Sequence, residues 1–313
     1  MLELSVVICA HNPRPQHLRR VLEALRAQTL PKEQWELLLI DNLSSEPLMT
    51  QWDLSWHPNG RHILEVELGL SAARQSGICE SSGSLLVFVD DDNVLDPNYL
   101  SIARSIGMEW PKLGTWGSGA TIPEFELEPA ESVKAFLPCL SLRDVDVARW
   151  GNVSAWESTP WGAGLCVRSE IAASYCRLKD RSALKLTGRK GTSLSSADDV
   201  EMSYVARHDG FGTGVFPELK LIHLIPKERV SSDYLFKLSQ AVYASSLIVT
   251  YKWGGGLPNN PFGPRDLLST VKNLMARRGS DRRRYFTYVL AVIEARRLIA
   301  GNSSKELARY RAT

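Results

Sequence analysis

Short apolar runs alternate with helical patterns over the first hundred residues of the chain. Four runs have the length and β-branched character of strands that are buried on both faces. These runs are SVVICA (5–10), WELLLIDN (35–42), RHILEVE (61–67) and SLLVFVD (84–90). Strands that alternate with helices form an open, mostly parallel sheet with helices on both faces, so this half of the chain is predicted to have an α/β fold.

Helices are predicted between these strands. Residues 13–29 carry leucine and valine side chains at the i, i+3, i+4, i+7 spacing of an amphipathic helix. The segment GLSAARQSGICESS is expected to run from a loop into a second helix. Asp96 and Pro97 are a suitable N-cap and first-turn pair for a third helix, which is expected to reach about Met108.

The segment from 110 to 230 is less regular. Strands of a smaller, mixed sheet are predicted at TWGSGATI, WGAGLCVRS and FGTGVFPELKLIHLI. A helix is predicted at SSADDVEMSYVARHDG, with Ser195 or Ser196 near its N-cap and Gly210 at its end. The stretch WGGGLPNNPFGP (253–264) is dense in Gly, Pro and Asn, and it is expected to separate this domain from basic C-terminal helices.

The composition narrows the class of protein. With 44% hydrophobic and 23% charged residues, the chain is neither disordered nor fibrous. The five cysteines are scattered without a CxxC pair, which favours reduced thiols in a cytosolic protein over disulfides or a zinc site. The N-terminus lacks the pattern of a signal peptide, and no apolar run approaches the roughly 18–20 residues that span a bilayer. We therefore expect a cytoplasmic protein.

Charge is distributed unevenly along the chain. The net charge is +2, but residues 265–313 contain twelve Lys and Arg against four Asp and Glu. Such a segment is either a solvated helical surface or a contact for anionic lipid or an acidic partner. Peripheral contact with the inner face of a membrane through the basic C-terminal segment is one of the two expectations.

Polar residues stand at the ends of three predicted strands. His11 and Asn12 follow the first strand, Asp41 and Asn42 end the second, and three aspartates (90–92) end the fourth. Ligands of open α/β sheets bind beyond the carboxyl ends of the strands. We therefore expect these side chains to face one crevice.

The run of three aspartates needs a reason, because neighbouring carboxylates repel one another. In an extended strand end, Asp90 and Asp92 would point to one side and Asp91 to the other. Two converging carboxylates are unfavourable unless a cation neutralises them. A hard divalent ion such as Mg²⁺ or Mn²⁺ fits, with substrate phosphates completing its coordination. The alternative is that the aspartates only end a strand, but Asp96 is already placed to cap the next helix.

The motifs SVVICAHN, LLLIDNLS, GLSAARQSG and VFVDDDN, in this order and spacing, resemble the family 2 glycosyltransferases of the GT-A fold. The resemblance covers about residues 3–230. It implies a catalytic domain over 1–230, with a nucleotide-sugar-binding half (1–110) and an acceptor half (111–230), followed by a helical, basic extension over 231–313. It also implies that an Asp-x-Asp element holds the donor diphosphate through Mn²⁺ or Mg²⁺.

Carried over by position, the resemblance assigns the residues that would hold the diphosphate. Asp92 would be a metal ligand, and Asp90 would face the ribose or the water shell of the metal. Arg74 matches the family's arginine near the diphosphate and donor sugar, where a guanidinium gives a charge-assisted contact. The alternative for Arg74 is an exposed residue on a helix.

The remaining donor contacts follow from the same resemblance. Asp41 would contact the nucleobase, while Ala10, His11 and Asn12 would line the nucleotide pocket. His223, at the end of the last strand, would complete the metal shell, although a single His on an apolar strand is also typical of a core residue. Lys227 and Arg229, just beyond it, would contact the diphosphate or only solvent; both readings stay open.

The second acidic cluster, Asp198 and Asp199, lies in SSADDVEM. Glycosyl transfer with inversion needs a carboxylate that takes the proton of the acceptor hydroxyl. The family places this base in a Glu-Asp pair that opens a helix, so we expect Asp199 to be the base. Asp198 stands where Glu is usual, which leaves open which of the two reaches the acceptor. The alternative is a favourable interaction of both with the helix dipole.

The segment WGAGLCVRSE resembles the family's small-residue segment under the donor sugar and acceptor. Gly162 and Gly164 would permit close approach of the backbone to the donor. Trp161 would stack on a sugar face of the acceptor, or else would belong to the core.

Together these features predict an inverting, metal-dependent glycosyltransferase of the hexosyl or N-acetylhexosaminyl type. It would move one sugar from a nucleotide-diphosphate sugar, with UDP-sugars favoured, to a hydroxyl of a glycan, polysaccharide or lipid-linked acceptor. The chain lacks a GxGxxG turn after the first strand and a P-loop, which argues against nicotinamide dehydrogenases and P-loop hydrolases. It has no recognised nucleic-acid-binding module. The remaining alternative is a non-catalytic scaffold of the same fold that binds a nucleotide-sugar or a glycan.

Overall fold

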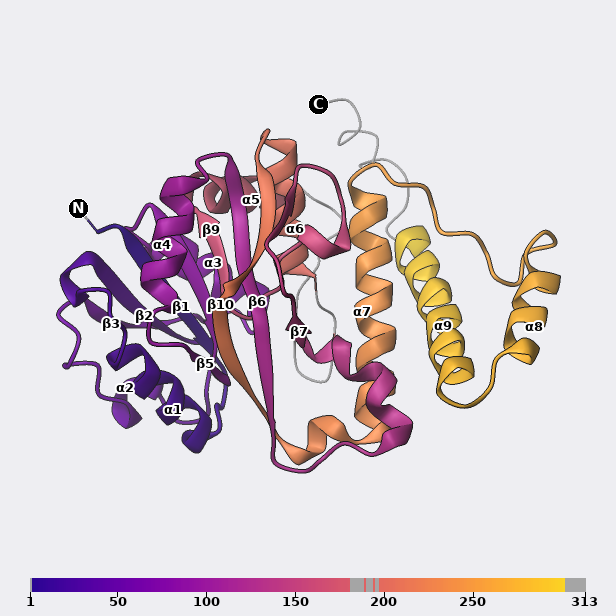
Figure 1. The fold of residues 1–313 in the computed structure, drawn as a ribbon, viewed down its shortest axis with the longest axis horizontal. Helices are drawn as coiled ribbons and strands as arrows, with labels where there is room; N and C mark the ends of the chain where they lie inside the picture. Colours follow the sequence, from indigo (N-terminus) through magenta and orange to yellow (C-terminus); the bar gives the residue numbers. More distant parts are fainter. Residues whose placement is uncertain (1, 181–188, 190–193, 195–196, 302–313) are drawn as a thin grey trace.

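The computed structural model describes residues 2–180, 189, 194 and 197–301. A single ten-stranded sheet forms the centre of the molecule, and helices cover both of its faces (Figure 1). The N-terminal strands lie at one end of the sheet, and the C-terminal helices stand beyond the other end. The predicted α/β fold, with a mostly parallel central sheet flanked by helices and with further C-terminal helices, is therefore confirmed.

The sheet runs in the order β3-β2-β1-β4-β9-β6-β10-β5, with β7 and β8 paired to β6 and β10. The first four strands are parallel, as predicted from their apolar runs. The strands are β1 (Leu4–Ala10), β2 (Trp35–Asp41), β3 (Gly60–Leu64), β4 (Leu85–Asp90), β5 (Asn93–Leu95), β6 (Leu113–Phe125), β7 (Arg143–Asp144), β8 (Arg149–Gly151), β9 (Leu165–Arg168) and β10 (Gly212–Ile225).

The predicted mixed strands do not form a separate sheet. Strand β9 pairs antiparallel with both β4 and β6, so it joins the parallel part to the mixed part. Strands β6 and β10 are parallel to each other, and the short β5 runs antiparallel to β10. The result is one continuous sheet in which the strands of both halves end close together.

The helices are α1 (Pro15–Arg26), α2 (Leu48–Gln51), α3 (Leu70–Glu80), α4 (Tyr99–Glu109), α5 (Ser169–Asp180), α6 (Asp198–His208), α7 (Ser232–Lys252), α8 (Leu267–Ala276) and α9 (Gly279–Gly301). Short 3₁₀ helices are η1 (Lys32–Gln34), η2 (Glu131–Leu140), η3 (Trp156–Ser158) and η4 (Lys227–Val230). Over the described ranges, no helix has the length and apolar character needed to cross a bilayer.

The alternation of side chains along the parallel strands builds two apolar cores. Val6 and Ile8 of β1 belong to a cluster with buried residues of α1 and α4 on one face. Val7, which points to the opposite face, belongs to a cluster with α3, α5 and α6. Both faces of these strands are thus buried, as the continuous apolar runs predicted. All five cysteines are free thiols.

Two predicted helix starts differ from the structure. Helix α4 begins at Tyr99 with Asn98 at its N-cap, so the prediction of Asp96 as the cap was wrong by two residues. The Asp96 carboxylate instead accepts a hydrogen bond from the Asn98 backbone at 2.9 Å and shapes the preceding turn. Helix α6 begins at Asp198, and Ala197 occupies its N-cap position. The predicted cap residues Ser195 and Ser196 lie outside the described residues.

Helix α7 is fixed to the sheet domain by a buried ion pair. The Lys252 ammonium at its end contacts the Glu201 carboxylate on α6, and both side chains are less than 5% exposed. Helix α7 also shares apolar clusters with α9 and with η2. The boundary predicted at residue 230 therefore lies in a short 3₁₀ helix between two parts that pack together.

Replacing Lys252 with Met is expected to lower the free energy of unfolding by about 3–5 kcal/mol, because Glu201 would remain as an uncompensated buried charge. A double variant, Glu201→Leu with Lys252→Met, is expected to recover most of this loss. Urea denaturation measures both effects. The matched control is Lys134→Met, which breaks the exposed Lys134–Glu131 pair and should change little. Equal stability of the Lys252→Met and Lys134→Met variants would contradict the expectation.

Candidate active site

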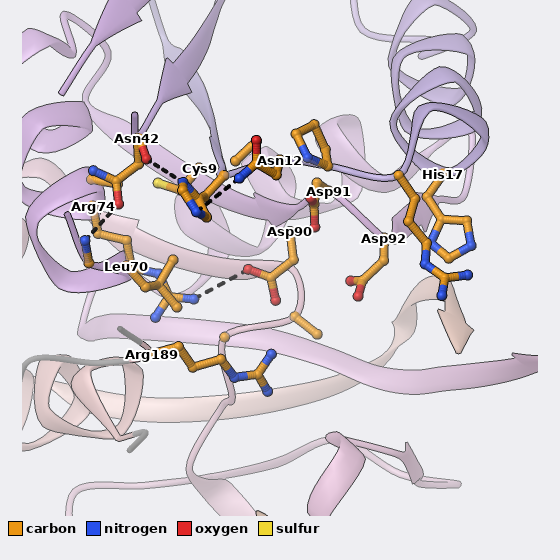
Figure 2. Close-up of a pocket in the computed structure, with 18 of the residues that line it drawn as sticks. Cys9, Asn12, His17, Asn42, Leu70, Arg74, Asp90, Asp91, Asp92 and Arg189 are labelled. Atoms are coloured by element: carbon orange, nitrogen blue, oxygen red, sulfur yellow. Dashed lines mark hydrogen bonds and ion pairs between the residues drawn. The ribbon is translucent and has the colours of Figure 1, made fainter. Parts of the chain in front are cut away.

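A cavity of about 370 Å³ lies beyond the carboxyl ends of β1 and β4 (Figure 2). Strands β1 and β4 are neighbours with Cys9 opposite Asp90, so the loops that follow them meet at one edge. The predicted site residues that line this cavity are Ala10, His11, Asn12, Arg74, Asp90, Asp92, Gly162, Asp198, Asp199 and His223. The structure thus brings together most of the residues predicted for the donor, the metal and the catalytic base.

The turn after β1 is tied to the loop after β2. Asn12 has a left-handed backbone with φ 48°, and its side-chain oxygen accepts a hydrogen bond from the Ser45 backbone at 2.8 Å. His11 Nδ1 lies 2.7 Å from the carbonyl oxygen of Asn42. These bonds hold the turn in place, so the cavity wall formed by Ala10, His11 and Asn12 is preorganised.

Asp41 does not line the cavity. Its two carboxylate oxygens accept hydrogen bonds from the backbone of Ser44 at 2.8 Å and Leu48 at 2.9 Å, and the residue is buried. Its observed function is to shape the loop after β2. The predicted contact with a nucleobase therefore stays a prediction, while the neighbouring Asn42 does line the cavity.

All three aspartates of the acidic run line the cavity, including Asp91 (Figure 2). The expectation that Asp91 points away was wrong, because β4 ends at Asp90 and the alternation of a strand does not continue through the turn. Burial, and then the carboxylates of Asp92 and Asp90, raise the pKa of Asp91 to about 7. This is the electrostatic consequence of three acids that share one wall.

The carboxylate of Asp92 has polar partners at both of its oxygens. Its Oδ2 accepts a hydrogen bond from Arg229 Nη1 at 2.7 Å and lies 3.5 Å from His223 Nε2. Its Oδ1 accepts a bond from the Asn93 side chain at 3.0 Å. Although burial acts in the opposite direction, His223 and Arg229 hold the pKa of Asp92 well below its usual range. Asp92 is thus an anion with directed polar neighbours.

The position of His223 follows from the sheet. Strand β5 starts directly after Asp92 and pairs with β10 so that Asn93 lies opposite His223. The imidazole therefore reaches Asp92 from the next strand. Its Nδ1 is buried and has no hydrogen-bond partner among the described residues.

The acidic run and His223 offer donor atoms for a divalent cation. Within the described ranges, no three His, Cys, Asp or Glu side chains are arranged to hold a metal by themselves. However, the crowded carboxylates and the imidazole of His223, whose Nε2 lies 3.5 Å from Asp92 Oδ2, are oxygen and nitrogen donors that line one cavity. Mg²⁺ and Mn²⁺ commonly use one or two protein carboxylates and take their remaining ligands from phosphates and water. The donor set fits this kind of site.

Arg74 joins the two acidic clusters that lie far apart in the sequence. Its Nη1 donates to Asp198 Oδ2 at 2.9 Å, and its Nη2 lies 3.4 Å from Asp90 Oδ1. The side chain is buried rather than exposed on a helix. Burial disfavours its charge, but Asp198 and the other nearby carboxylates outweigh this and raise the pKa of Arg74. Arg74 is therefore a permanent cation in the wall of the cavity.

The two acids that open α6 are in different environments. Asp198 is paired with Arg74, whereas Asp199 accepts hydrogen bonds only from backbone groups, Gly162 N–H at 2.6 Å and Val200 N–H at 2.8 Å, among its described contacts. Burial, and then the carboxylate of Asp198, raise the pKa of Asp199. Because its pKa is raised, Asp199 has a higher proton affinity than an ordinary aspartate, which suits a general base.

The two predicted glycines have different positions. A Cβ on Gly162 would lie 2.7 Å from Arg74 Nη2 and 3.1 Å from Asp199 Oδ2, so this glycine makes room for the charged groups. Gly164 does not line the cavity. It has φ +70°, and a Cβ there would lie 2.2 Å from the Tyr99 hydroxyl, which donates to the Gly164 carbonyl. Gly164 thus allows Tyr99 to pack against the backbone, and its predicted contact with the donor stays a prediction.

Trp161 lies outside this cavity and borders a second one beside it. Its ring is 5.0 Å from that of Trp156, and the Arg143 guanidinium stands 3.6 Å from its centre. The predicted contact of Trp161 with an acceptor stays a prediction.

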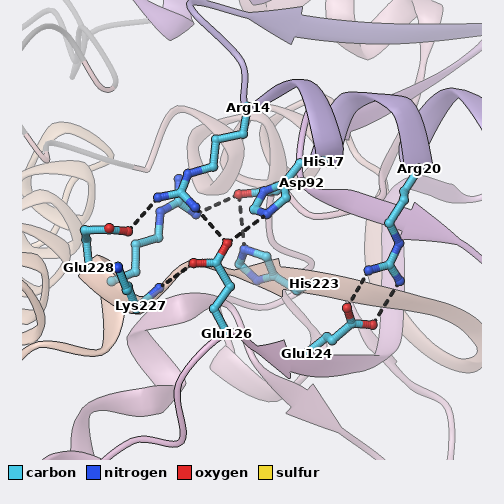
Figure 3. Close-up of polar contacts among 10 residues, drawn as sticks. Arg14, His17, Arg20, Asp92, Glu124, Glu126, His223, Lys227 and Glu228 are labelled. Carbon is cyan, nitrogen blue, oxygen red and sulfur yellow. Dashed lines mark hydrogen bonds and ion pairs between the residues drawn. The ribbon is translucent and has the colours of Figure 1, made fainter.

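Several residues that line the first cavity were missed from the sequence, among them Arg14, His17, Ser141 and Arg189. Figure 3 shows that Arg14 bridges Glu126 on the loop after β6 and Glu228 on η4, at 2.7 and 2.6 Å. This network holds η4, and with it Arg229, over the acidic run. Arg14 follows the turn at the end of β1 by two residues, and this position is the sequence signal by which it could have been found.

Comparisons with known proteins agree with the geometry. Residues 5–103 match the sequence profile of the family described as glycosyl transferase family 2. Glycosyltransferase AglE of Haloferax volcanii is 33% identical over 92 residues, which are 28% of this chain and 30% of that protein. The uncharacterized protein y4gI of Sinorhizobium fredii is 32% identical over 107 residues, 33% of this chain and 12% of that protein. The matches thus span less than a third of either relative.

Solved structures of S. aureus TarS resemble the whole chain. TarS 1–349 has a TM-score of 0.51 at 12% identity, covering 95% of this chain and 90% of that one. The same fragment in complex with UDP-GlcNAc has a TM-score of 0.52 at 12% identity and the same coverage. At this identity the likeness concerns the fold. The resemblance to the family 2 glycosyltransferases is thus confirmed for residues 5–103, which match the profile of that family, and the chain as a whole shares the fold of TarS.

Proposed function

We propose that this protein is an inverting glycosyltransferase that moves one sugar from a UDP-sugar to an acceptor hydroxyl. The observation that carries the proposal is the cavity in which Arg74 joins the acidic run after β4 to the Asp198–Asp199 pair. A nucleotide diphosphate needs cationic partners, and the acceptor hydroxyl needs a base, within one site. The solved TarS complex with UDP-GlcNAc makes this nucleotide-sugar the first donor to test.

Each charged residue has a defined task in this proposal. Asp199 takes the proton of the acceptor hydroxyl while the hydroxyl oxygen attacks C1 of the sugar from the face opposite the diphosphate. Arg74 stabilises the negative charge that develops on the leaving diphosphate. Asp198 keeps Arg74 oriented through the 2.9 Å bond. The turn formed by His11 and Asn12 borders the nucleotide.

Asp92 and Asp90, with His223 beside them, would hold Mn²⁺ or Mg²⁺. When bound, such an ion neutralises charge on the diphosphate as a Lewis acid. Arg229 would exchange its bond with Asp92 for one with the diphosphate, since a guanidinium pairs well with either anion. This exchange explains how one carboxylate can have a cationic partner in the structure and a metal in the working enzyme.

A binding screen tests the donor proposal. Thermal melting of the protein with UDP, GDP, dTDP and CDP, each with and without Mn²⁺, is expected to show the largest shift for UDP with Mn²⁺. Saturating ligand at about 100 times its Kd stabilises the folded state by about 2.7 kcal/mol, which is readily measured as a shift in Tm. An equal shift with all four nucleotides, or none with any, would contradict the proposal of a UDP-sugar donor.

We also propose that the C-terminal helices contact an anionic bilayer. Helix α8 exposes Leu268, Val271 and Met275, at 82, 44 and 78%, with the spacing of one helix face. The exposed cations Arg278 and Arg282 follow on the turn into α9. An apolar stripe bordered by cations is typical of a helix that lies in the interface of an anionic membrane.

Sedimentation with vesicles tests this contact. Binding to vesicles of phosphatidylglycerol and phosphatidylcholine is expected, with much weaker binding to phosphatidylcholine alone, because the cations need anionic headgroups. A Leu268→Ser, Met275→Ser double variant is expected to lose binding, while Met49→Ser, an exposed methionine on α2, serves as the control. Binding that is equal for both lipids, or unchanged in the double variant, would contradict the contact.

A further inference from the structure

A second cavity, of about 430 Å³, lies against the first. Ser141, Arg189 and Asp199 line both cavities. Asp199 therefore stands between the two spaces, with its carboxylate available to a group that enters from the second one. The position of a base at the junction of two cavities is what a two-substrate transfer reaction requires.

The walls of the second cavity come from the sheet domain and from the C-terminal helices. Trp156 and Trp161 form one side, Val242 and Tyr243 of α7 form another, and Arg284 of α9 completes it. Helix α7 lies between the sheet and α9 (Figure 1). The C-terminal helices thus contribute directly to a space that opens onto Asp199.

The lining is largely apolar. The two tryptophan rings are 5.0 Å apart, and Val242 and Tyr243 face the same space. Ser246, one of the few hydroxyls there, donates its hydrogen bond to the Val242 carbonyl of its own helix at 2.9 Å. A cavity of this size with few polar groups binds an apolar or aromatic moiety more favourably than a fully hydroxylated sugar chain.

One cation interrupts this apolar lining on the α9 side. Arg284 is about half exposed, and among the described residues the ion pair of its guanidinium is a long contact with Asp281 at 3.9 Å. A contact of this length on the surface contributes little and leaves most of the donor capacity of the guanidinium for a ligand. The cavity therefore offers a carboxylate base, an apolar wall and two arginines, Arg189 where the two cavities meet and Arg284 on the α9 side.

We propose that the second cavity holds the acceptor and that the acceptor is an amphipathic anion: a hydroxyl at Asp199, an apolar chain against Val242 and Tyr243, and a phosphate at Arg284. This rests on the proposed glycosyltransferase function. In the transfer, the bond from the acceptor oxygen to C1 forms as the bond from C1 to the diphosphate oxygen breaks. The hydroxyl proton goes to Asp199, and the electron pair of the broken bond leaves with the nucleoside diphosphate.

Calorimetric titration with octyl phosphate, butyl phosphate and inorganic phosphate tests the cavity without any need for turnover. Octyl phosphate is expected to bind at least about tenfold more tightly than butyl phosphate, since each buried methylene adds to the affinity. Inorganic phosphate is expected to bind more weakly than either. Equal affinity for octyl phosphate and inorganic phosphate would overturn the proposal.

Variants locate the site of binding. Val242→Glu and Arg284→Glu are each expected to weaken octyl phosphate binding at least about tenfold, because each places a carboxylate against the apolar chain or the phosphate. The conservative Val242→Thr and Arg284→Lys variants are expected to retain most of the binding and guard against misfolding. Arg297→Glu, on the same helix, is the matched charge control. Unchanged binding in Val242→Glu and Arg284→Glu would overturn the assignment to this cavity.

UDP binding and turnover of UDP-sugars are measured on the same samples. If UDP-sugars turn over but octyl glycosides are no better acceptors than the matching methyl glycosides, the inference about the acceptor fails and the proposed function stands. If octyl phosphate binds as expected and no nucleotide-sugar is turned over, the cavity is confirmed as an amphiphile site and the proposed transfer reaction fails.

Discussion

Replacing Asp199 with Asn is expected to remove sugar transfer while UDP binding is retained. The amide oxygen can still accept the hydrogen bond from Gly162 N–H, which is 2.6 Å long in the structure, while the bond from Val200 N–H at the start of the same helix is lost. The amide cannot take a proton from the acceptor hydroxyl. Loss of a general base typically lowers the rate by about 10²–10⁴-fold. Nucleotide release from a UDP-sugar in the presence of acceptor measures the rate, and calorimetry measures UDP binding.

The pH dependence of the native protein supplies a second readout for the same residue. Burial and the neighbouring Asp198 raise the pKa of Asp199, and the base acts only when it is deprotonated. The rate of transfer should therefore fall as the pH decreases through this raised pKa, at a pH above the ordinary value of about 3.9 for aspartate.

Two variants keep the test of Asp199 specific. Asp209→Asn, directly after the other end of α6, removes a carboxylate that lines neither cavity and should leave the rate unchanged. Asp198→Asn breaks the 2.9 Å bond to Arg74 and should weaken the binding of UDP as well as the rate. If Asp198→Asn lost only transfer, while Asp199→Asn kept both transfer and the fall of its rate at low pH, the base would be Asp198 and not Asp199.

Replacing Asp92 with Asn is expected to remove the dependence of UDP binding on Mn²⁺. A neutral amide is a weaker ligand for a hard cation than a carboxylate. Mutation of residues that only hydrogen-bond to a metal ligand lowers metal affinity by about 10–100-fold. Loss of a direct ligand should lower the affinity for Mn²⁺ by at least as much. Titration of UDP at increasing Mn²⁺ concentrations measures the effect. Asp144→Asn, on the exposed β7, is the control.

The bond between Asp92 and Arg229 requires a further comparison. If Asp92 served only to position Arg229, then Arg229→Met would reproduce the effect of Asp92→Asn with and without Mn²⁺. We expect a different result: Arg229→Met should weaken UDP binding in both conditions but keep the increase on addition of Mn²⁺. Identical Mn²⁺ responses of the two variants would mean that Asp92 is not a metal ligand.

The sequence predicted the parallel part of the fold well, for a clear physical reason. The residues 5–10, 35–42 and 84–90 are continuous apolar runs, and strands buried on both faces require that pattern. The carboxyl ends of parallel strands meet at one edge of the sheet, so the sequence alone indicates that His11 and Asp90 face one crevice.

The contacts between distant elements could not be predicted in this way. Nothing in the sequence places Asp198 against Arg74. The pair depends on how α6 and α3 pack on the same face of the sheet, where both contribute to one apolar cluster. The orientation of Asp91 was missed because an alternation rule for strands was applied to a turn. The family resemblance implies that Asp41 contacts the nucleobase; in the structure local backbone donors occupy its carboxylate, and the nucleobase contact stays a prediction.

The part played by the C-terminal helices was also not visible in the sequence. Their composition is rich in Lys and Arg, which indicates that these helices lie at the surface of the protein. It did not indicate that Tyr243 and Arg284 border a cavity that reaches Asp199. Such a wall combines residues from Trp156 to Arg284 that belong to separate elements, and no local pattern encodes it.

The most direct test of the central claim is the release of nucleotide diphosphate from a panel of nucleotide-sugars in the presence of Mn²⁺, first without acceptor and then with octyl glycosides. We predict slow release of UDP from at least one UDP-sugar without acceptor, faster release when an acceptor is added, and neither in the Asp199→Asn variant. Tight binding of a UDP-sugar without any release of UDP under either condition would contradict the account and would identify the protein as a nucleotide-sugar-binding scaffold.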